Sequence, residues 1–75
     1  MVREKVLETI ADFLYLDSSE VDEETNLDLE YALTDDDMHL LKKRLETLFD
    51  IEIDDADFDN FGTVGEIIDY IENEI

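Results

Sequence analysis

The sequence predicts an all-α domain, a bundle of three main helices and one short helix that spans residues 1–75. Three segments carry apolar residues at intervals of three and four, the spacing that places them on one face of a helix. Residues 27–33 and 50–54 alternate in the manner of strands, but neither has a partner strand in view. We therefore expect both stretches to be extended loop, and we expect no sheet.

The first helix is expected from Val2 to about Tyr15. Its apolar face is formed by Val2, Val6, Ile10, Phe13 and Leu14. A long connection, residues 16–33, follows, in which Asp17-Ser18-Ser19 signals a turn and Val21 is the expected anchor. Four further side chains are expected to pin this loop to the core: Leu27, Leu29, Tyr31 and Leu33. Long loops in small domains are often functional.

The central helix is expected from about Asp35 to Phe49. Thr34 is placed to cap its first turn and Asp37 to reach back to the cap. The predicted buried stripe consists of Met38, Leu41, Leu45 and Leu48, with Phe49 at its edge. His39 lies opposite this stripe, which favours a solvent-facing residue over a general base. No serine, cysteine or second histidine accompanies it at the spacing of a catalytic triad, so an enzyme is not expected.

The C-terminal third contains the short helix and the last main helix. Residues 55–60 are expected to form one helical turn, with Phe58 and Phe61 pointing inward. The segment from Thr63 to Glu66 matches a capping box that opens the last helix. Its buried stripe is predicted to be Val64, Ile67, Ile68 and Ile71, with Tyr70 and Ile75 at the margin.

The charge balance is strongly acidic, with 24 acidic residues against 5 basic ones and a net charge of −19. Such a chain repels nucleic acid and anionic membranes and attracts basic protein surfaces and divalent cations. A hydrophobic content of 44% with clear periodicity indicates a folded chain rather than a disordered acidic tail. The absence of cysteine excludes disulfides and thiolate metal sites. Without a membrane-length apolar run or a signal-peptide pattern, we expect a cytoplasmic protein. We also expect a monomer.

Three stretches carry a resemblance to a known family: residues 48–53 (Leu-Phe-Asp-Ile-Glu-Ile), residues 62–71, and Glu20-Val21 with the loop that follows. Through them the whole chain resembles the acyl carrier proteins, small acidic four-helix bundles with a long first loop. The resemblance implies a non-catalytic role in fatty-acid or related carrier-dependent metabolism. In that family an Asp-Ser-Leu motif begins the second helix, and its serine is esterified with 4′-phosphopantetheine.

The attachment serine has no counterpart in this sequence. In the ungapped register the three motif positions are Thr34, Asp35 and Asp36. A carboxylate at position 35 cannot accept the group as a stable phosphodiester, so the resemblance implies a chain without 4′-phosphopantetheine. The alternative is a working carrier modified at Thr34. In the same register the family's inward positions fall partly on His39 and Lys42, which leaves open whether the helix is rotated or the interior cleft is rebuilt.

The resemblance also implies a docking surface for partner enzymes. In the family, acidic residues along the second helix and the next loop meet basic patches on those enzymes, an interaction that raises association rates and is sensitive to salt. Carried over to this chain, the docking residues are Asp36, Asp37, Leu40, Glu46, Glu52 and Asp54. The basic run at residues 42–44 interrupts this face.

A calcium site is a third interpretation. Positions 1, 3, 5, 7, 9 and 12 of an EF-hand loop are matched by Asp55, Asp57, Asp59, Phe61, Thr63 and Glu66. The match fails at position 6, where Asn60 replaces glycine, and at position 8, where Gly62 replaces an apolar residue. The hypothesis is a calcium-responsive module, or weak binding of divalent cations, at Asp55, Asp57, Asp59 and Glu66.

Overall fold

The computed structural model describes residues 2–75, except for the side chain of Asp28. Its elements are α1 (Val2–Leu14), the 3₁₀ turn η1 (Ser18–Glu20), α2 (Leu27–Tyr31), α3 (Asp35–Phe49), α4 (Asp55–Asp59) and α5 (Val64–Glu74). Over this described range the chain contains no strand. The predicted all-α class is therefore confirmed, and the boundaries predicted for the central helix are those observed.

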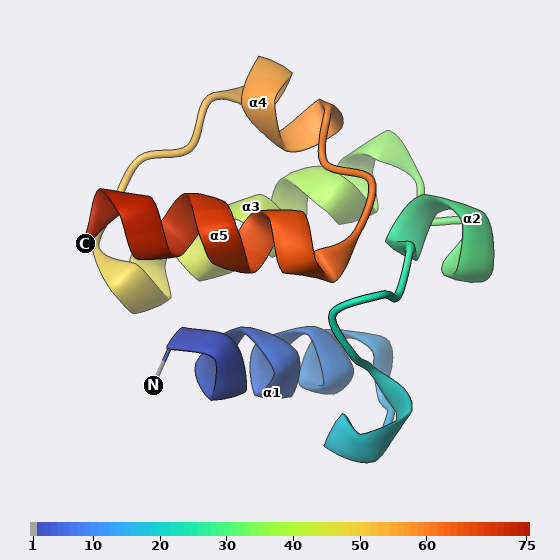
Figure 1. The fold of residues 1–75 in the computed structure, drawn as a ribbon. Helices are drawn as coiled ribbons and strands as arrows, with labels where there is room; N and C mark the ends of the chain where they lie inside the picture. Colours follow the sequence, from blue (N-terminus) through green and yellow to red (C-terminus); the bar gives the residue numbers. More distant parts are fainter. Residues whose placement is uncertain (1) are drawn as a thin grey trace.

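One core lies between the three long helices. Figure 1 shows α1 and α5 running in opposite directions, with α3 behind α5 and the short helix α4 at the far side from α1. The buried apolar side chains come from the long helices, the short helices α2 and α4, and the connections, and they are Val6, Leu7, Ile10, Ala11, Val21, Leu27, Leu41, Leu45, Ile53, Phe58, Val64, Ile67, Ile68 and Ile71. Val21 is buried as predicted, and so is Phe58, while Phe61 is half-buried. The rings of Phe58 and Phe61 meet edge to face with their centroids 5.7 Å apart.

The prediction of extended loop for residues 27–33 was wrong. Residues 27–31 form the helical turn α2, because Asn26 caps it: the Asn26 side-chain oxygen accepts a hydrogen bond from Leu29 N at 3.0 Å. In a helix, residues two apart do not share a face, so alternation does not bury all four predicted anchors. Leu27 is buried, whereas Leu29 is 82% exposed. Residues 51–54 form no helix or strand, as predicted.

The predicted buried stripe of α3 was partly wrong. Leu41 and Leu45 are buried, but Leu48 is 45% exposed, and Lys42 is buried with 5% of its surface exposed. Lys42 lies at the edge of the apolar stripe on the helical wheel, next to Met38 and Phe49, and its ammonium finds polar partners inside, so the apolar stem can be buried with it. The inner face of α3 thus includes Lys42, as the family register suggested, while His39 is exposed, as its position opposite the stripe predicted.

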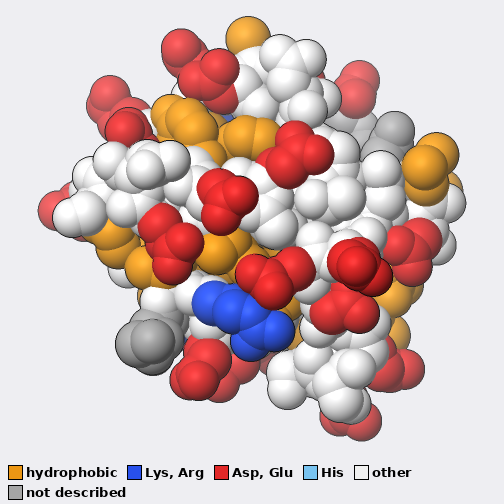
Figure 2. All heavy atoms as spheres, in the orientation of Figure 1, with side chains coloured by type: hydrophobic (Ala, Val, Ile, Leu, Met, Phe, Trp, Pro, Cys, Tyr) orange, Lys and Arg blue, Asp and Glu red, His pale blue; other side chains and the backbone are white. Residues whose placement is uncertain are grey.

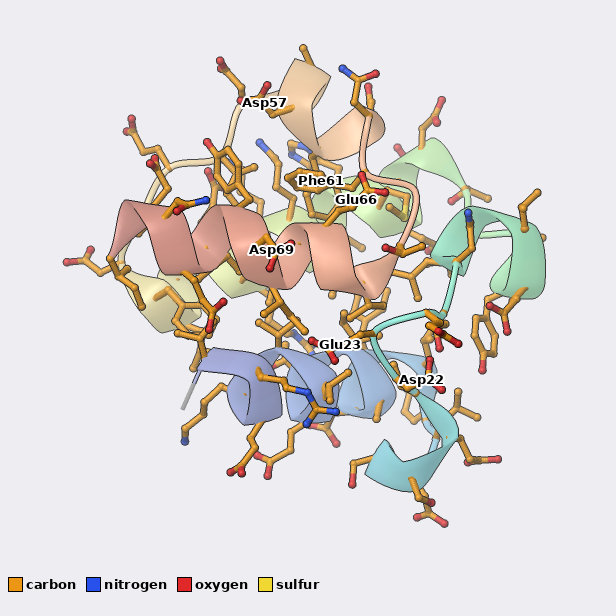
Figure 3. All side chains as sticks on the ribbon, in the orientation of Figure 1. Asp22, Glu23, Asp57, Phe61, Glu66 and Asp69 are labelled. Atoms are coloured by element: carbon orange, nitrogen blue, oxygen red, sulfur yellow. The ribbon has the colours of Figure 1, made fainter. Side chains whose placement is uncertain are left out.

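The beginning of α5 is capped differently from the prediction. Thr63 is the N-cap residue, but its side chain makes no capping hydrogen bond. The free N–H groups are satisfied by the long connection instead: Val64 N donates to Thr25 O and Gly65 N to Glu23 O, both at 2.9 Å. A Cβ on Gly65 would lie 3.0 Å from Glu23 O, which explains the glycine. Figure 3 shows Glu23 on the connection that passes between α1 and α5.

Candidate functional site at the beginning of α3

The first turn of α3 is held by the predicted capping box. Thr34 Oγ1 accepts a hydrogen bond from Asp37 N at 3.1 Å, and Asp37 Oδ2 accepts one from Thr34 N at 3.2 Å. The hydroxyl of Thr34 and the carboxylate of Asp37 therefore have a structural function. This arrangement fixes where the next two residues, Asp35 and Asp36, emerge on the surface.

Asp35 is the first residue of α3, is exposed, and borders two adjoining hollows. The larger, of about 550 Å³, lies between α2, α3 and α4 and has apolar walls of Leu29, Leu33, Met38, Phe58 and Phe61. The smaller, of about 280 Å³, includes His39, Lys42 and Asp55 in its lining. The position predicted to match the family's attachment site thus lies at the rim of a groove with apolar walls.

Lys42 ties α3 to the segment that follows it. Its Nζ lies 2.7 Å from Asp55 Oδ1, donates a hydrogen bond to Ile53 O at 3.2 Å, and lies 3.9 Å from Glu46 Oε1. Glu46 Oε2 in turn accepts a hydrogen bond from Ile53 N at 2.7 Å. Both backbone groups of Ile53 are thereby satisfied by side chains of α3. We call Lys42, Glu46, Ile53 and Asp55 the Lys42 network.

The charges of this network shift two pKa values in the directions that favour the ion pair. The hydrogen bond from Lys42 lowers the pKa of Asp55 below its ordinary value. The hydrogen bond to Asp55 raises the pKa of Lys42, against the opposing effect of its burial. His39 Nδ1 lies 3.8 Å from the same carboxylate oxygen of Asp55. Sequence reasoning missed the network, although the position of Lys42 at the edge of the apolar stripe on the helical wheel was the available signal.

The six predicted docking residues lie in different environments. Asp36, Glu52 and Asp54 are exposed, and Leu40 is 58% exposed. Asp37 is half-buried in the capping box, and the Glu46 side chain is only 14% exposed within the Lys42 network. The structure therefore leaves four of the six at the surface, and we call Asp36, Leu40, Glu52 and Asp54 the α3 docking surface. In the basic run, Lys42 is buried and the Lys43 side chain is 61% exposed.

Residues 55–66 do not form a calcium loop. Residues 55–59 are the helix α4, and Asp55 is engaged by Lys42. Within residues 2–75 the structure gathers no group of three or more acidic or histidine side chains placed to hold a metal ion. The four residues Asp55, Asp57, Asp59 and Glu66 are thus not brought together into one site. Figure 3 shows Asp57 on α4 and Glu66 on α5, at separate places on the molecule.

Comparison with known proteins identifies the class of domain. Residues 4–71 match the model of the family described as "Phosphopantetheine attachment site". Two similar curated proteins are each named "Acyl carrier protein". The one from Thermotoga maritima is 35% identical over 71 residues, covering 95% of this chain and 88% of the relative. The one from Clostridium acetobutylicum is also 35% identical over 71 residues, covering 95% of this chain and 92% of the relative. The chain belongs to the acyl carrier protein family, and the resemblance seen in the sequence is confirmed.

The side chains at the beginning of α3 do not fit the family's prosthetic group. A phosphodiester to 4′-phosphopantetheine needs a hydroxyl, and position 35 offers a carboxylate. The neighbouring hydroxyl, that of Thr34, accepts the capping hydrogen bond from Asp37 N. Ser18 and Ser19 belong to η1, outside the first turn of α3.

Among the helices of residues 2–75, none is long and apolar enough to cross a membrane.

Proposed function

We propose that this chain is a non-catalytic acyl-carrier-like module that docks basic partner enzymes of carrier-dependent metabolism without carrying 4′-phosphopantetheine at position 35. The observation that supports this proposal is that Asp35 places a carboxylate in the first turn of α3, a helix whose N-terminal cap is complete. Thr34 and Asp37 make a complete capping box around it, so the local structure is intact while the attaching hydroxyl is absent.

The α3 docking surface supports the partner class. Leu40 offers an exposed apolar side chain, and Asp36 lies one helical turn before it. Glu52 and Asp54 add carboxylates on the segment after α3. An apolar contact surrounded by acidic groups is complementary to a basic surface with an apolar centre, and the net charge of −19 steers such a partner toward it. Figure 2 shows that acidic side chains are also spread over the face formed by α1 and α5, with hydrophobic patches between them.

Intact mass spectrometry tests the proposal directly. The chain is incubated with coenzyme A and a promiscuous phosphopantetheinyl transferase, and the mass before and after is compared. The wild-type chain is expected to keep its mass, and Asp35→Ser is expected to gain one phosphopantetheinyl group. Asp36→Ser makes the same change in charge one residue later and is expected to gain none.

Two results would contradict the proposal. A gain of mass by the wild-type chain would show that it is a working carrier, and repetition with Thr34→Ala would then show whether Thr34 carries the group. Failure of Asp35→Ser to gain mass, with its circular dichroism unchanged, would contradict the assignment of position 35 as the attachment position.

Docking is tested separately by surface plasmon resonance against a basic carrier-dependent enzyme, in which Leu40→Ala and Asp36→Lys are expected to weaken binding.

A further inference from the structure

Tyr15 occupies a backbone position that glycine normally fills. At the end of α1, Leu16 N donates to Ala11 O at 2.8 Å and Tyr15 N donates to Asp12 O at 3.2 Å, the two bonds of a Schellman motif. The residue after the helix in this motif adopts the left-handed conformation, and Tyr15 has a φ of 59°. A side chain with a Cβ is strained there, whereas glycine is not.

The aromatic ring contributes almost nothing to the fold in return. Tyr15 is 96% exposed, so its side chain buries little surface against the rest of the chain. Large aromatic side chains normally stabilise a protein through burial. Ala32 and Asp50 are also left-handed, but among these three residues only Tyr15 adds a large exposed ring. This ring points to a contact outside the chain.

Tyr15 borders a hollow of about 950 Å³ between the end of α1, η1 and α3. Its remaining apolar lining consists of half-buried side chains: Phe13, Leu14, Leu16 and Leu33. Its acidic lining consists of Asp12, Asp17, Glu20 and Asp37. Among the described side chains that line it, Arg44 is the one basic group, and its guanidinium is placed 5.4 Å from the centre of the Phe13 ring.

A second hollow adjoins the first and shares three of its residues, Asp12, Leu16 and Asp17. It extends to Leu48, which is 45% exposed on α3. The two hollows together place two exposed apolar side chains, Tyr15 and Leu48, on one acidic surface. Figure 1 shows α1 and η1 on the opposite side of the bundle from α4, which carries part of the apolar groove beside Asp35.

We call the surface formed by these two adjoining hollows the α1-end surface. We propose that it is a docking site for a basic segment of a partner protein, with Tyr15 as its anchor. The partner segment presents lysine or arginine side chains to the exposed carboxylates of Asp12, Asp17 and Glu20 and receives the Tyr15 ring in an apolar recess. In the first hollow, three exposed carboxylates against one guanidinium make the surface complementary to a cationic partner. Tyrosine is also among the side chains that most often dominate binding energy at interfaces.

The test uses a designed helical peptide of leucine and lysine as the probe, titrated by isothermal calorimetry into the wild-type chain and Tyr15→Gly. Glycine is expected to raise the melting temperature by a few degrees, because it removes the strain at a left-handed position. The same substitution is expected to weaken peptide binding by about tenfold or more. Tyr15→Phe is expected to retain most of the binding. A purely structural tyrosine would give the opposite result, a lower melting temperature.

A matched pair of double variants separates local complementarity from net charge. Asp12→Asn with Asp17→Asn removes two charges from the α1-end surface, and Asp69→Asn with Glu72→Gln removes two exposed charges from α5, where Figure 3 labels Asp69. The first pair is expected to weaken peptide binding at least threefold more than the second. Equal weakening, or binding unchanged by Tyr15→Gly, would overturn the inference.

Nuclear magnetic resonance separates this inference from the proposed function. Bound peptide is expected to shift the amide signals of residues 12–17 and 44–48. Shifts confined to residues 36–40 and 52–54 would refute the α1-end surface while supporting the α3 docking surface.

Discussion

Replacing Glu46 with alanine tests whether the Lys42 network stabilises the fold. Glu46 Oε2 accepts the hydrogen bond of Ile53 N at 2.7 Å, and Ile53 is only 3% exposed. The other oxygen, Oε1, lies 3.9 Å from Lys42 Nζ and 3.8 Å from Lys43 Nζ. Alanine removes the acceptor and leaves a buried backbone N–H without the partner it has in the native state.

The magnitude follows from the nature of these contacts. A hydrogen bond to a charged group contributes about 1.5–3 kcal/mol to stability, and an orphaned buried N–H retains its desolvation cost. The contact with Lys43 adds little, since the Lys43 side chain is 61% exposed and such pairs are worth less than about 1 kcal/mol. The contact with Lys42 is long, at 3.9 Å, and Lys42 keeps its closer partners Asp55 and Ile53 O when Glu46 is removed. We therefore expect Glu46→Ala to lose about 2 kcal/mol. At about 4–8 °C per kcal/mol for a domain of this size, the melting temperature should fall by about 8–16 °C.

The assay is thermal and urea unfolding followed by circular dichroism at neutral pH. Glu72→Ala on the exposed face of α5 makes the same change in net charge and is expected to stay within about 0.5 kcal/mol of wild type. Glu46→Gln retains an acceptor oxygen without the charge and should fall between the two. If Glu46→Ala and Glu72→Ala have the same stability, the network does not hold residues 51–55 in place.

Two further expectations concern the cap and the ion pair. Thr34→Ala removes the capping oxygen of α3 and should lower stability by about 1 kcal/mol. Thr63→Ala removes a side chain that makes no capping hydrogen bond and should change stability little. Equal losses of stability in thermal melts would contradict the assignment of the caps. The pKa of Asp55 is lowered by Lys42, so the contribution of its ion pair is present above the ordinary carboxyl pKa of about 4 and is lost as the pH falls through the lowered folded value. Asp55→Asn should therefore melt below wild type at pH 7, and this difference should shrink below about pH 4. A difference independent of pH would show that the ion pair is not its source.

The elements that the sequence predicted well are those in which one local rule decides the structure. The capping box at Thr34 fixes the start of α3, and regular spacing of large apolar residues fixes the buried faces of α1 and α5. In α1 the prediction was only partly right: Val6 and Ile10 are buried, but Leu7 and Ala11 are buried as well, and Val2, Phe13 and Leu14 are half-buried. The signals that succeeded lie within a few residues, so no knowledge of distant contacts is needed. For α4 the same holds on a smaller scale, because Phe58 alone anchors a single turn.

The errors arose where a distant part of the chain supplies the partner. Leu48 fits the apolar spacing of α3, but the structure buries Lys42 instead, since Ile53 O and Asp55 satisfy its ammonium. The start of α5 resembles a capping box, yet its N–H groups bond to the carbonyls of residues 23 and 25. Local patterns reveal what a helix end needs but do not identify which group provides it.

The two positions of α3 at which we predict a departure from the family, Asp35 and Lys42, lie at separate places on the helix, so experiments can test them separately. Asp35 is exposed, and the cap around it is made by Thr34 and Asp37, so a serine at position 35 changes the chemistry there without removing a stabilising contact. Lys42 is buried, and its replacement would disturb the segment at residues 51–55 together with the interior. A result from Asp35→Ser therefore reports on attachment and recognition by the transferase, whereas a result from the Lys42 network reports on the fold.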